Sequence, residues 1–149
     1  MIVRYVRERK DDKKLQNFHL TLNQCYICLG IIFYGDSSIA PQIIILSDPR
    51  YIPCSFDLDC FDCVDPHIPD GWKFLGDSRG FCRLYPKEID DDFWDKLEEG
   101  NEVSQVILDA IIRKIERFHN IKIEDINKIQ KVENLFKPED PCGWPFQYK

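Results

Sequence analysis

Neither a signal peptide nor a membrane-spanning segment is expected from this sequence. Its longest apolar run, 26–34 (YICLGIIFY), is about half of the ~20 residues that a membrane-spanning helix needs. The opening residues, MIVRYVRERKDDKK, carry charges where a signal peptide needs an apolar core. We therefore expect a protein that stays in the cytoplasm and does not contact a membrane.

Catalytic and nucleic-acid-binding signatures are also missing. The chain has three histidines, and none lies in a motif for nucleophilic catalysis. His67, between Asp65 and Asp70, could meet a thiol such as Cys63, but a single histidine in a proline-rich loop is more often a turn residue. The pI near 5.1 argues against a nucleic-acid binder, which normally has a basic face. We expect a protein that is not an enzyme and needs no cofactor.

No repeat, low-complexity tract or linker divides the chain. With 149 residues, 44% of them hydrophobic, it is long enough to bury a core of its own. We predict a single domain over 1–149, with a strand-rich part (1–85), a helical part (86–136) and a C-terminal strap (137–149).

Periodicity predicts the elements of this domain. Runs rich in β-branched and aromatic residues predict strands at 1–7, 17–23, 26–34, 42–46, 72–74 and 81–85, with one or two more within 53–64. Apolar residues at helical spacing predict helices at 91–99, 101–118 and 124–136, with Gly100 and Asn101 as caps between the first two. The fold class is α+β: an antiparallel twisted sheet in the N-terminal half, packed by C-terminal helices. The predicted core contains Ile31, Phe33, Ile43, Ile45, Leu84, Val103, Ile107, Ile111 and Ile115.

The seven cysteines leave one alternative open. Cys25-x-x-Cys28 and Cys60-x-x-Cys63 have the outline of a four-thiolate zinc site. Residues i and i+3 of an extended strand, however, point to opposite faces. We interpret the cysteines as reduced thiols, mostly core residues, and expect no bound metal; a zinc-binding protein is the less favoured reading.

The segment 55–102 concentrates negative charge. It holds fourteen Asp and Glu against five Lys and Arg, whereas the rest of the chain holds twelve against fifteen. Aromatic residues are interspersed with these acids, and aromatic anchors surrounded by charge are typical of protein interfaces. The acidic balance would favour a basic protein partner, because opposite potentials speed association.

The order of elements from about residue 22 to residue 101 resembles small immunity proteins of bacterial polymorphic toxin systems. The stretches YICLGI, QIIILSD, FDCVDPHIPDGWKF, LYPKEI and DDFWDKLEEGNE carry this resemblance. Two elements within them contribute most, D-x-x-(I/L)-P-x-x-W and P-x-E…FW, here represented by Asp65, Pro69, Trp72, Pro86, Glu88, Phe93 and Trp94.

The resemblance implies inhibition without chemistry: the protein would bind a cognate toxin domain in the cytoplasm, often a nuclease, and block its active site or a nearby surface. We place the binding residues in the acidic segment, at Asp57, Asp59, Asp62, Asp65 and Asp70, with Trp72 or Trp94 as an anchor. The alternative is a cytoplasmic interaction module without a toxin partner. The sequence does not decide the oligomeric state.

Overall fold

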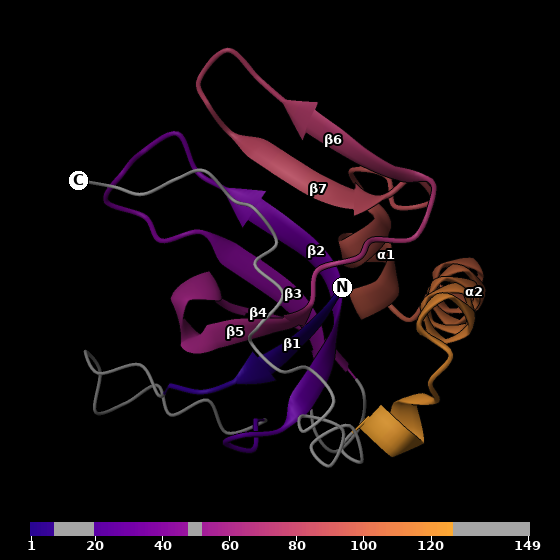
Figure 1. Ribbon diagram of the computed structural model, residues 1–149. Helices are drawn as coiled ribbons and strands as arrows, with labels where there is room; N and C mark the ends of the chain where they lie inside the picture. Colours follow the sequence, from indigo (N-terminus) through magenta and orange to yellow (C-terminus); the bar gives the residue numbers. More distant parts are fainter. Residues whose placement is uncertain (8–19, 48–51, 127–149) are drawn as a thin grey trace.

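The computed structural model describes residues 1–7, 20–47 and 52–126. These residues form seven strands, a short 3-10 helix and two α-helices (Figure 1). The strands are β1 (Ile2–Tyr5), β2 (Cys25–Phe33), β3 (Gln42–Ser47), β4 (Ile52–Asp57), β5 (Phe61–Asp65), β6 (Trp72–Gly76) and β7 (Cys82–Pro86). The helices are η1 (Leu58–Cys60), α1 (Phe93–Glu98) and α2 (Glu102–His119). The predicted α+β class, with an antiparallel sheet followed by helices, is confirmed.

The sheet branches at β2. On one side β2 pairs with β3, and β3 pairs with β4. On the other side β2 pairs with β1 through residues 25–27 and with β7 through residues 31–33. β5 continues the sheet beyond β1, and β6 continues it beyond β7. The β6–β7 hairpin therefore forms a separate arm, which extends away from β1 and β5 in Figure 1.

A β-bulge divides β2 into two halves, and the alternation of its side chains between the two faces of the sheet reverses at the bulge. The register against β3 shifts between Cys28 and Gly30, and an inserted residue reverses the alternation of side chains. Before the bulge, Ile27 and Leu29 pack toward the helices while Cys28 packs on the other face. After it, Ile31 lies on the same face as Cys28. One strand thus supplies both sides of the sheet with apolar residues.

The face of the sheet toward α1 and α2 carries the larger core, here called the helix-side core. Its buried residues come from β1, β2, β3, β7, both helices and the segments that follow β7 and α2: Ile2, Cys25, Ile27, Leu29, Ile44, Leu46, Tyr85, Ile89, Phe93, Leu108, Ile111, Ile115 and Ile126. The other face carries a second core, here called the opposite core, made of Met1, Val3, Tyr5, Tyr26, Cys28, Ile31, Ile43, Ile45, Cys60 and Phe61.

A glycine is required at position 30, where the ring of Tyr85 from β7 packs against the backbone of the bulge. A Cβ atom at this position would lie 2.2 Å from Cδ1 of Tyr85, far inside the 3.5–4.0 Å of an ordinary carbon contact. The tyrosine ring lies over the glycine and also contacts Trp94 edge-on, with ring centroids 6.2 Å apart. Trp94 in turn packs against Phe93 at 5.0 Å, so this aromatic group joins β7 to α1.

Most predicted elements are confirmed, with differences at particular places. Residues 20–23 contain a turn and no strand, and the remainder of the strand predicted at 17–23 lies outside the described residues. The helix predicted at 124–136 is represented by a short 3-10 turn at 123–126, and its remainder also lies outside the described residues. Within 53–64, η1 interrupts the chain, so the predicted two-residue alternation does not continue from β4 into β5.

The predicted core is wrong at two positions. Five of its nine residues are buried, Ile31, Ile43, Ile45, Ile111 and Ile115, and Leu84 and Ile107 are half-buried. Phe33 is exposed because it ends β2, and Val103 is 67% exposed because α2 turns a different side to the sheet. That side is defined by Ser104, Leu108, Ile111 and Ile115.

Candidate partner-binding surface

Many acidic side chains of 55–102 are neutralised locally. Asp77 accepts hydrogen bonds from the guanidinium of Arg79 within the β6–β7 turn, and Asp91 pairs with Arg83 of β7. Lys96 lies 3.8 Å from both Asp90 and Asp92 at the start of α1, and Lys114 of α2 lies 3.5 Å from Glu88. Each of these carboxylates has a cationic partner within the chain, although Asp90 and Asp92 share a single lysine.

Three of the predicted binding aspartates, unlike the acids above, are exposed and have no cationic partner among the described residues. Asp59 in η1, Asp62 in β5 and Asp70 in the loop before β6 are exposed. None of them pairs with a cation in the part of the chain that the structure describes. Asp57, at the end of β4, is half-buried and already has an interaction within the chain. Unneutralised negative charge therefore lies at the corner between β4 and β5, and also along α1 and at the start of α2, where further exposed acids have no ion pair among the described residues: Asp95, Glu98, Glu99 and Glu102.

Asp65 has a structural environment that the sequence did not reveal. Its Oδ2 lies 2.7 Å from Nδ1 of His119 at the end of α2, and its Oδ1 lies 2.7 Å from Nδ1 of His67. The backbone N–H of His67 also donates to Oδ1, at 2.9 Å. Partial burial alone would raise the pKa of Asp65, but the hydrogen bonds from His67 and His119 outweigh it, and the pKa is lowered. Asp65 connects β5 to α2.

His119 is the buried member of this group. Its side chain is 2% exposed, and its Nε2 lies 3.2 Å from the amino group of Met1. With Nδ1 donating to Asp65, Nε2 is free to accept a hydrogen bond from that amino group. Burial and the nearby positive charge lower the pKa of His119, although Asp65 opposes the effect. The ring is thus held in its neutral form.

Both predicted tryptophan anchors are half-buried. Trp72, the first residue of β6, packs against both cores. Trp94 packs against the helix-side core within the aromatic group of α1 and β7. Each ring therefore contributes to stability, and only part of its surface is open to a partner.

Phe74 is an exposed aromatic residue that sequence reasoning missed. It lies two residues after Trp72 on β6 and is 64% exposed. The pairing register places it at one end of a cross-strand row: Phe74, Leu84, Ile31, Ile43 and Phe56. Residues directly opposite one another in a ladder share a face, so this row crosses the sheet on the side of the opposite core. The signal that could have found Phe74 is the edge position of β6.

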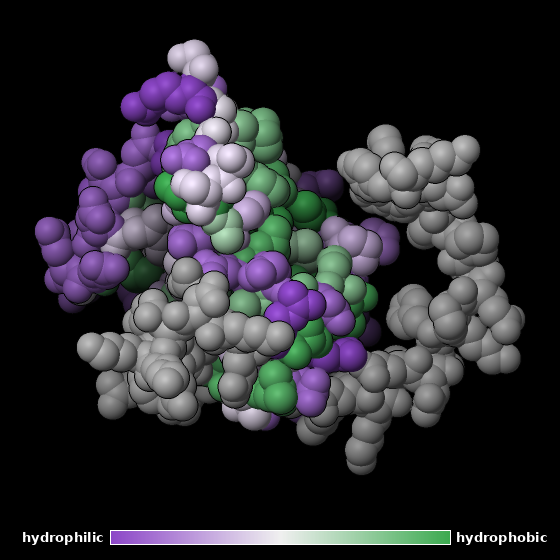
Figure 2. Space-filling view, turned by 90° about the vertical axis from the view of Figure 1, so that its left-hand side faces the viewer, coloured by the Kyte–Doolittle hydropathy of each residue, from purple (hydrophilic) through white to green (hydrophobic). Residues whose placement is uncertain are grey.

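The row separates the exposed phenylalanine from the acidic corner by a known number of strands, although Ile31 and Ile43 in its middle are buried in the opposite core. Phe56 is followed by Asp57 at the end of β4, and the four strand spacings from β6 to β4 correspond to roughly 19 Å along the sheet. On the face shown in Figure 2, a central hydrophobic area is bordered by hydrophilic residues. A span of this size fits within one standard protein interface, which covers about 800 Å² on each partner.

The cysteines do not form the four-thiolate arrangement considered above. Cys25 packs in the helix-side core and Cys28 in the opposite core, so their sulfurs lie on different sides of β2. Cys60 is buried whereas Cys63 is exposed. Among the described residues, no three side chains of His, Cys, Asp or Glu are grouped to hold a metal ion.

The thiols of Cys63 and Cys28 are poorly suited to act as nucleophiles. Desolvation, with a smaller contribution from Asp65, raises the pKa of Cys63, and burial raises that of Cys28 to about 12. A reactive thiol needs a lowered pKa. Within the described ranges, the ring of His67 is hydrogen-bonded to the carboxylate of Asp65 and to no thiol.

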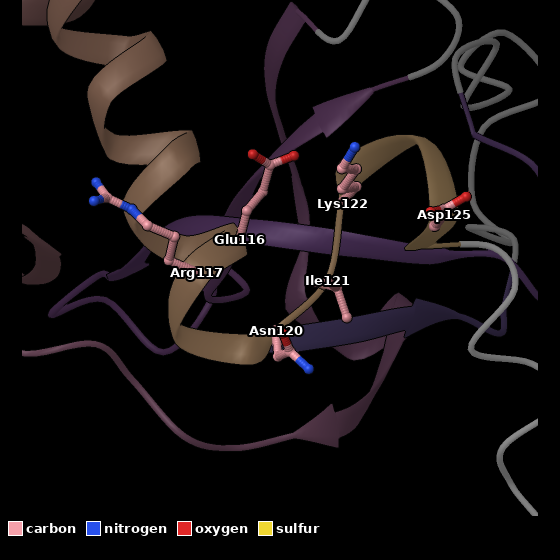
Figure 3. Close-up of a pocket in the computed structure, with 6 residues that line it drawn as sticks. All are labelled: Glu116, Arg117, Asn120, Ile121, Lys122 and Asp125. Atoms are coloured by element: carbon pink, nitrogen blue, oxygen red, sulfur yellow. The ribbon is translucent and has the colours of Figure 1, made fainter.

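A cavity of about 510 Å³ lies at the C-terminal end of α2, lined by Glu116, Arg117, Asn120, Ile121, Lys122 and Asp125 (Figure 3). Asn120 ends the helix in the left-handed conformation, and Glu116 accepts a hydrogen bond from the backbone of Ile123 at 2.8 Å. In Figure 3 the polar ends of Arg117, Lys122 and Asp125 point away from one another. The cavity results from the reversal of the chain after α2 and offers no convergent set of polar groups.

None of the helices in the described ranges is both long and apolar enough to cross a membrane. Comparisons with models of known protein families, with curated proteins and with solved structures found no match.

Proposed function

We propose that this protein is a non-catalytic immunity protein that binds and neutralises a cognate toxin domain of basic charge, such as a nuclease. The observation that carries the proposal is the combination of exposed, unpaired carboxylates in the acidic segment with an exposed aromatic residue on β6. Asp59, Asp62 and Asp70 are exposed without a cationic partner in the described ranges, whereas the three aspartates at 90–92 have one. Unpaired surface carboxylates attract a basic partner and speed its association.

The aromatic part of the interface is Phe74 with the open part of Trp72. Both belong to β6 and project to the same side because they are two residues apart. A large, exposed aromatic ring is the kind of residue that contributes most to binding when it enters a pocket of the partner. Trp94, packed between Phe93 and Tyr85, contributes mainly by holding α1 in place.

The proposal is tested by co-expression with the product of the adjacent gene, followed by affinity capture at low and high salt. The expected result is a stoichiometric complex that weakens as salt rises, together with relief of the partner's toxicity. A stable complex with a harmless partner would favour the alternative, an interaction module without a toxin. The absence of any complex and of any toxicity would refute the proposal.

Matched variants locate the interface. Asp59→Asn with Asp62→Asn should slow association at least about fivefold at low salt, since electrostatic steering changes association rates by ~10-fold or more. The control, Asp90→Asn with Asp92→Asn, changes the net charge equally but removes acids that already lie beside Lys96. Equal effects of the two pairs would place the interface elsewhere. Neutralisation is preferable to charge reversal because Arg4 of β1 lies directly opposite Asp62 of β5 in the strand pairing, where a new positive charge would be repelled.

The role of Phe74 is tested separately. Phe74→Ser should weaken the complex by about tenfold or more, as expected for an aromatic anchor, while leaving the melting temperature nearly unchanged because the ring is exposed. Trp72→Ala is the contrasting variant and should lower the melting temperature, since its ring packs against both cores. An unchanged affinity for Phe74→Ser would remove β6 from the interface.

A further inference from the structure

The outward side of α2 carries an exposed apolar stripe. Residues of a helix follow one another at 100°, so the side opposite Ser104, Leu108, Ile111 and Ile115 contains Val103, Val106 and Ala110. Val103 and Val106 are each 67% exposed, and Ala110 is also exposed. α2 lies at the edge of the molecule in Figure 1, beyond α1, so this stripe faces away from the sheet.

The charges beside the stripe are separated by sign along the helix. Glu102 and Asp109 lie in its N-terminal half, and Arg113 and Arg117 lie in its C-terminal half. All four are exposed, and none forms an ion pair in the part of the chain that the structure describes. Asp109 accepts a hydrogen bond from Gln105, and Arg117 donates to the carbonyl of Arg113. Both signs therefore remain available to an external partner.

We propose that this outer face of α2 binds α2 of a second copy of the chain in antiparallel orientation, forming a two-fold symmetric dimer. In such an arrangement centred on Ala110, Val103 lies opposite Arg117 of the second copy, and Val106 lies opposite Lys114 of that copy. Arg113 of the second copy then lies two residues from the position opposite Asp109, a shift of about 3 Å along the helix that its long side chain can span. Arg117 lies one residue from the position opposite Glu102, and symmetry repeats each pair. The small side chain of Ala110 at the crossing lets the two helices approach closely.

The distribution of charge selects a second copy over other partners. A basic partner would satisfy Glu102 and Asp109 but would repel Arg113 and Arg117, and an acidic partner would do the reverse. An antiparallel copy of the same helix satisfies all four charges, and it also opposes the two helix dipoles. The face contains none of the aspartates assigned to toxin binding, so the dimer does not depend on the proposed function.

A charge-swap experiment tests the dimer. Wild-type protein is examined by sedimentation velocity from about 1 to 500 μM, a range that covers the dissociation constants of weak and moderate complexes. The expected result is a concentration-dependent dimer that weakens with salt. Asp109→Arg and Arg113→Glu should each weaken it by about tenfold or more, because each substitution places like charges opposite one another at two symmetric positions.

Mixing the two variants provides the decisive measurement. In a heterodimer of the Asp109→Arg chain with the Arg113→Glu chain, every 109–113 contact again joins opposite charges, so dimerisation should return. A misfolded variant could not produce this rescue, and circular dichroism of each variant alone checks the fold. A wild-type protein that stays monomeric over the whole range overturns the proposal and leaves residues 127–149 of the same chain as the next candidate to cover the stripe. Single variants that dimerise like wild type, or a mixture without rescue, also overturn it.

Discussion

The connection between Asp65 and His119 provides a sharp test of what holds α2 to the sheet. His119→Ala removes a hydrogen bond between a buried ring and a carboxylate, at 2.7 Å. Hydrogen bonds to charged groups contribute about 1.5–3 kcal/mol. Because Asp65 is one-third exposed, water can replace part of the interaction, so we expect a loss of about 2 kcal/mol in the free energy of unfolding at pH 7.5. Urea denaturation followed by tryptophan fluorescence measures it.

His67→Ala is the matched control for this variant. It removes the other imidazole bound to the same carboxylate, at the same 2.7 Å, but its ring is 77% exposed. Exposed ion pairs contribute about 0–1 kcal/mol. The control should therefore lose less than half as much stability as His119→Ala. Equal losses, or no loss in His119→Ala, would show that the buried connection does not hold the helix.

His119 also makes the stability of the fold depend on pH, with a definite sign. The pKa of His119 is lowered in the folded protein, so the folded state binds a proton less readily than the unfolded chain. The resulting stability is present above the ordinary histidine pKa of about 6.5 and is lost as pH falls, by at most about 1.4 kcal/mol per pH unit. The lowered pKa of Asp65 acts in the same direction at lower pH.

The groups facing His119 are Asp65 and the Met1 amino group, with His67 beyond them. Wild-type protein should lose more stability than His119→Ala between about pH 6.5 and pH 5, since the variant no longer carries the buried ring. An identical pH dependence in the two proteins would refute the assignment of the neutral ring.

Two further predictions concern the sheet and the helix, and a third concerns the thiols. Gly30→Ala should destabilise the fold by about 3 kcal/mol through overpacking, and combining it with Tyr85→Leu should cost less than the sum of the two single changes in urea denaturation. Asn101→Ala should cost about 1 kcal/mol, because the side chain of Asn101 accepts the N–H of Ser104 at 3.1 Å; a thermal melt checks this. Iodoacetamide at pH 8 should label Cys63 in the folded protein and label Cys28 only after unfolding, as read by mass spectrometry; early labelling of Cys28 would contradict its burial.

The fold class follows from local pattern, whereas the site depends on distant pairings. Strand and helix periodicity, the cap at Asn101 and the β6–β7 turn are visible in short windows of sequence. Local ion pairs such as Asp77 with Arg79 are also within reach of sequence reasoning, because they lie two residues apart. The connection between Asp65 and His119 spans 54 residues and has no local signal. Sequence alone therefore grouped Asp65 with the binding aspartates without showing its structural role.

Whether an individual residue points into the core or to the surface depends on features that a regular hydrophobic pattern does not contain. The apolar residues of α2 are numerous enough to define a broad face, and the buried Ser104 moves its centre away from Val103. A hydrophobicity pattern cannot identify a serine as a core position, so Val103 was assigned to the wrong side. Similarly, the edge position of β6 leaves Phe74 exposed although its neighbour Trp72 packs inward. Both errors concern apolar residues that the structure leaves exposed.

The branching of the sheet at β2 has a consequence for synthesis of the chain. β1 and β3 lie close to β2 in sequence, but β7 begins at Cys82, 49 positions after β2 ends at Phe33. Until β7 has left the ribosome, the second half of β2 has an open edge at Ile31, Ile32 and Phe33. An open apolar edge is a site of mispairing between nascent chains. Arrival of the β6–β7 hairpin closes this edge, and a ribosomal pause before that point would prolong the exposure.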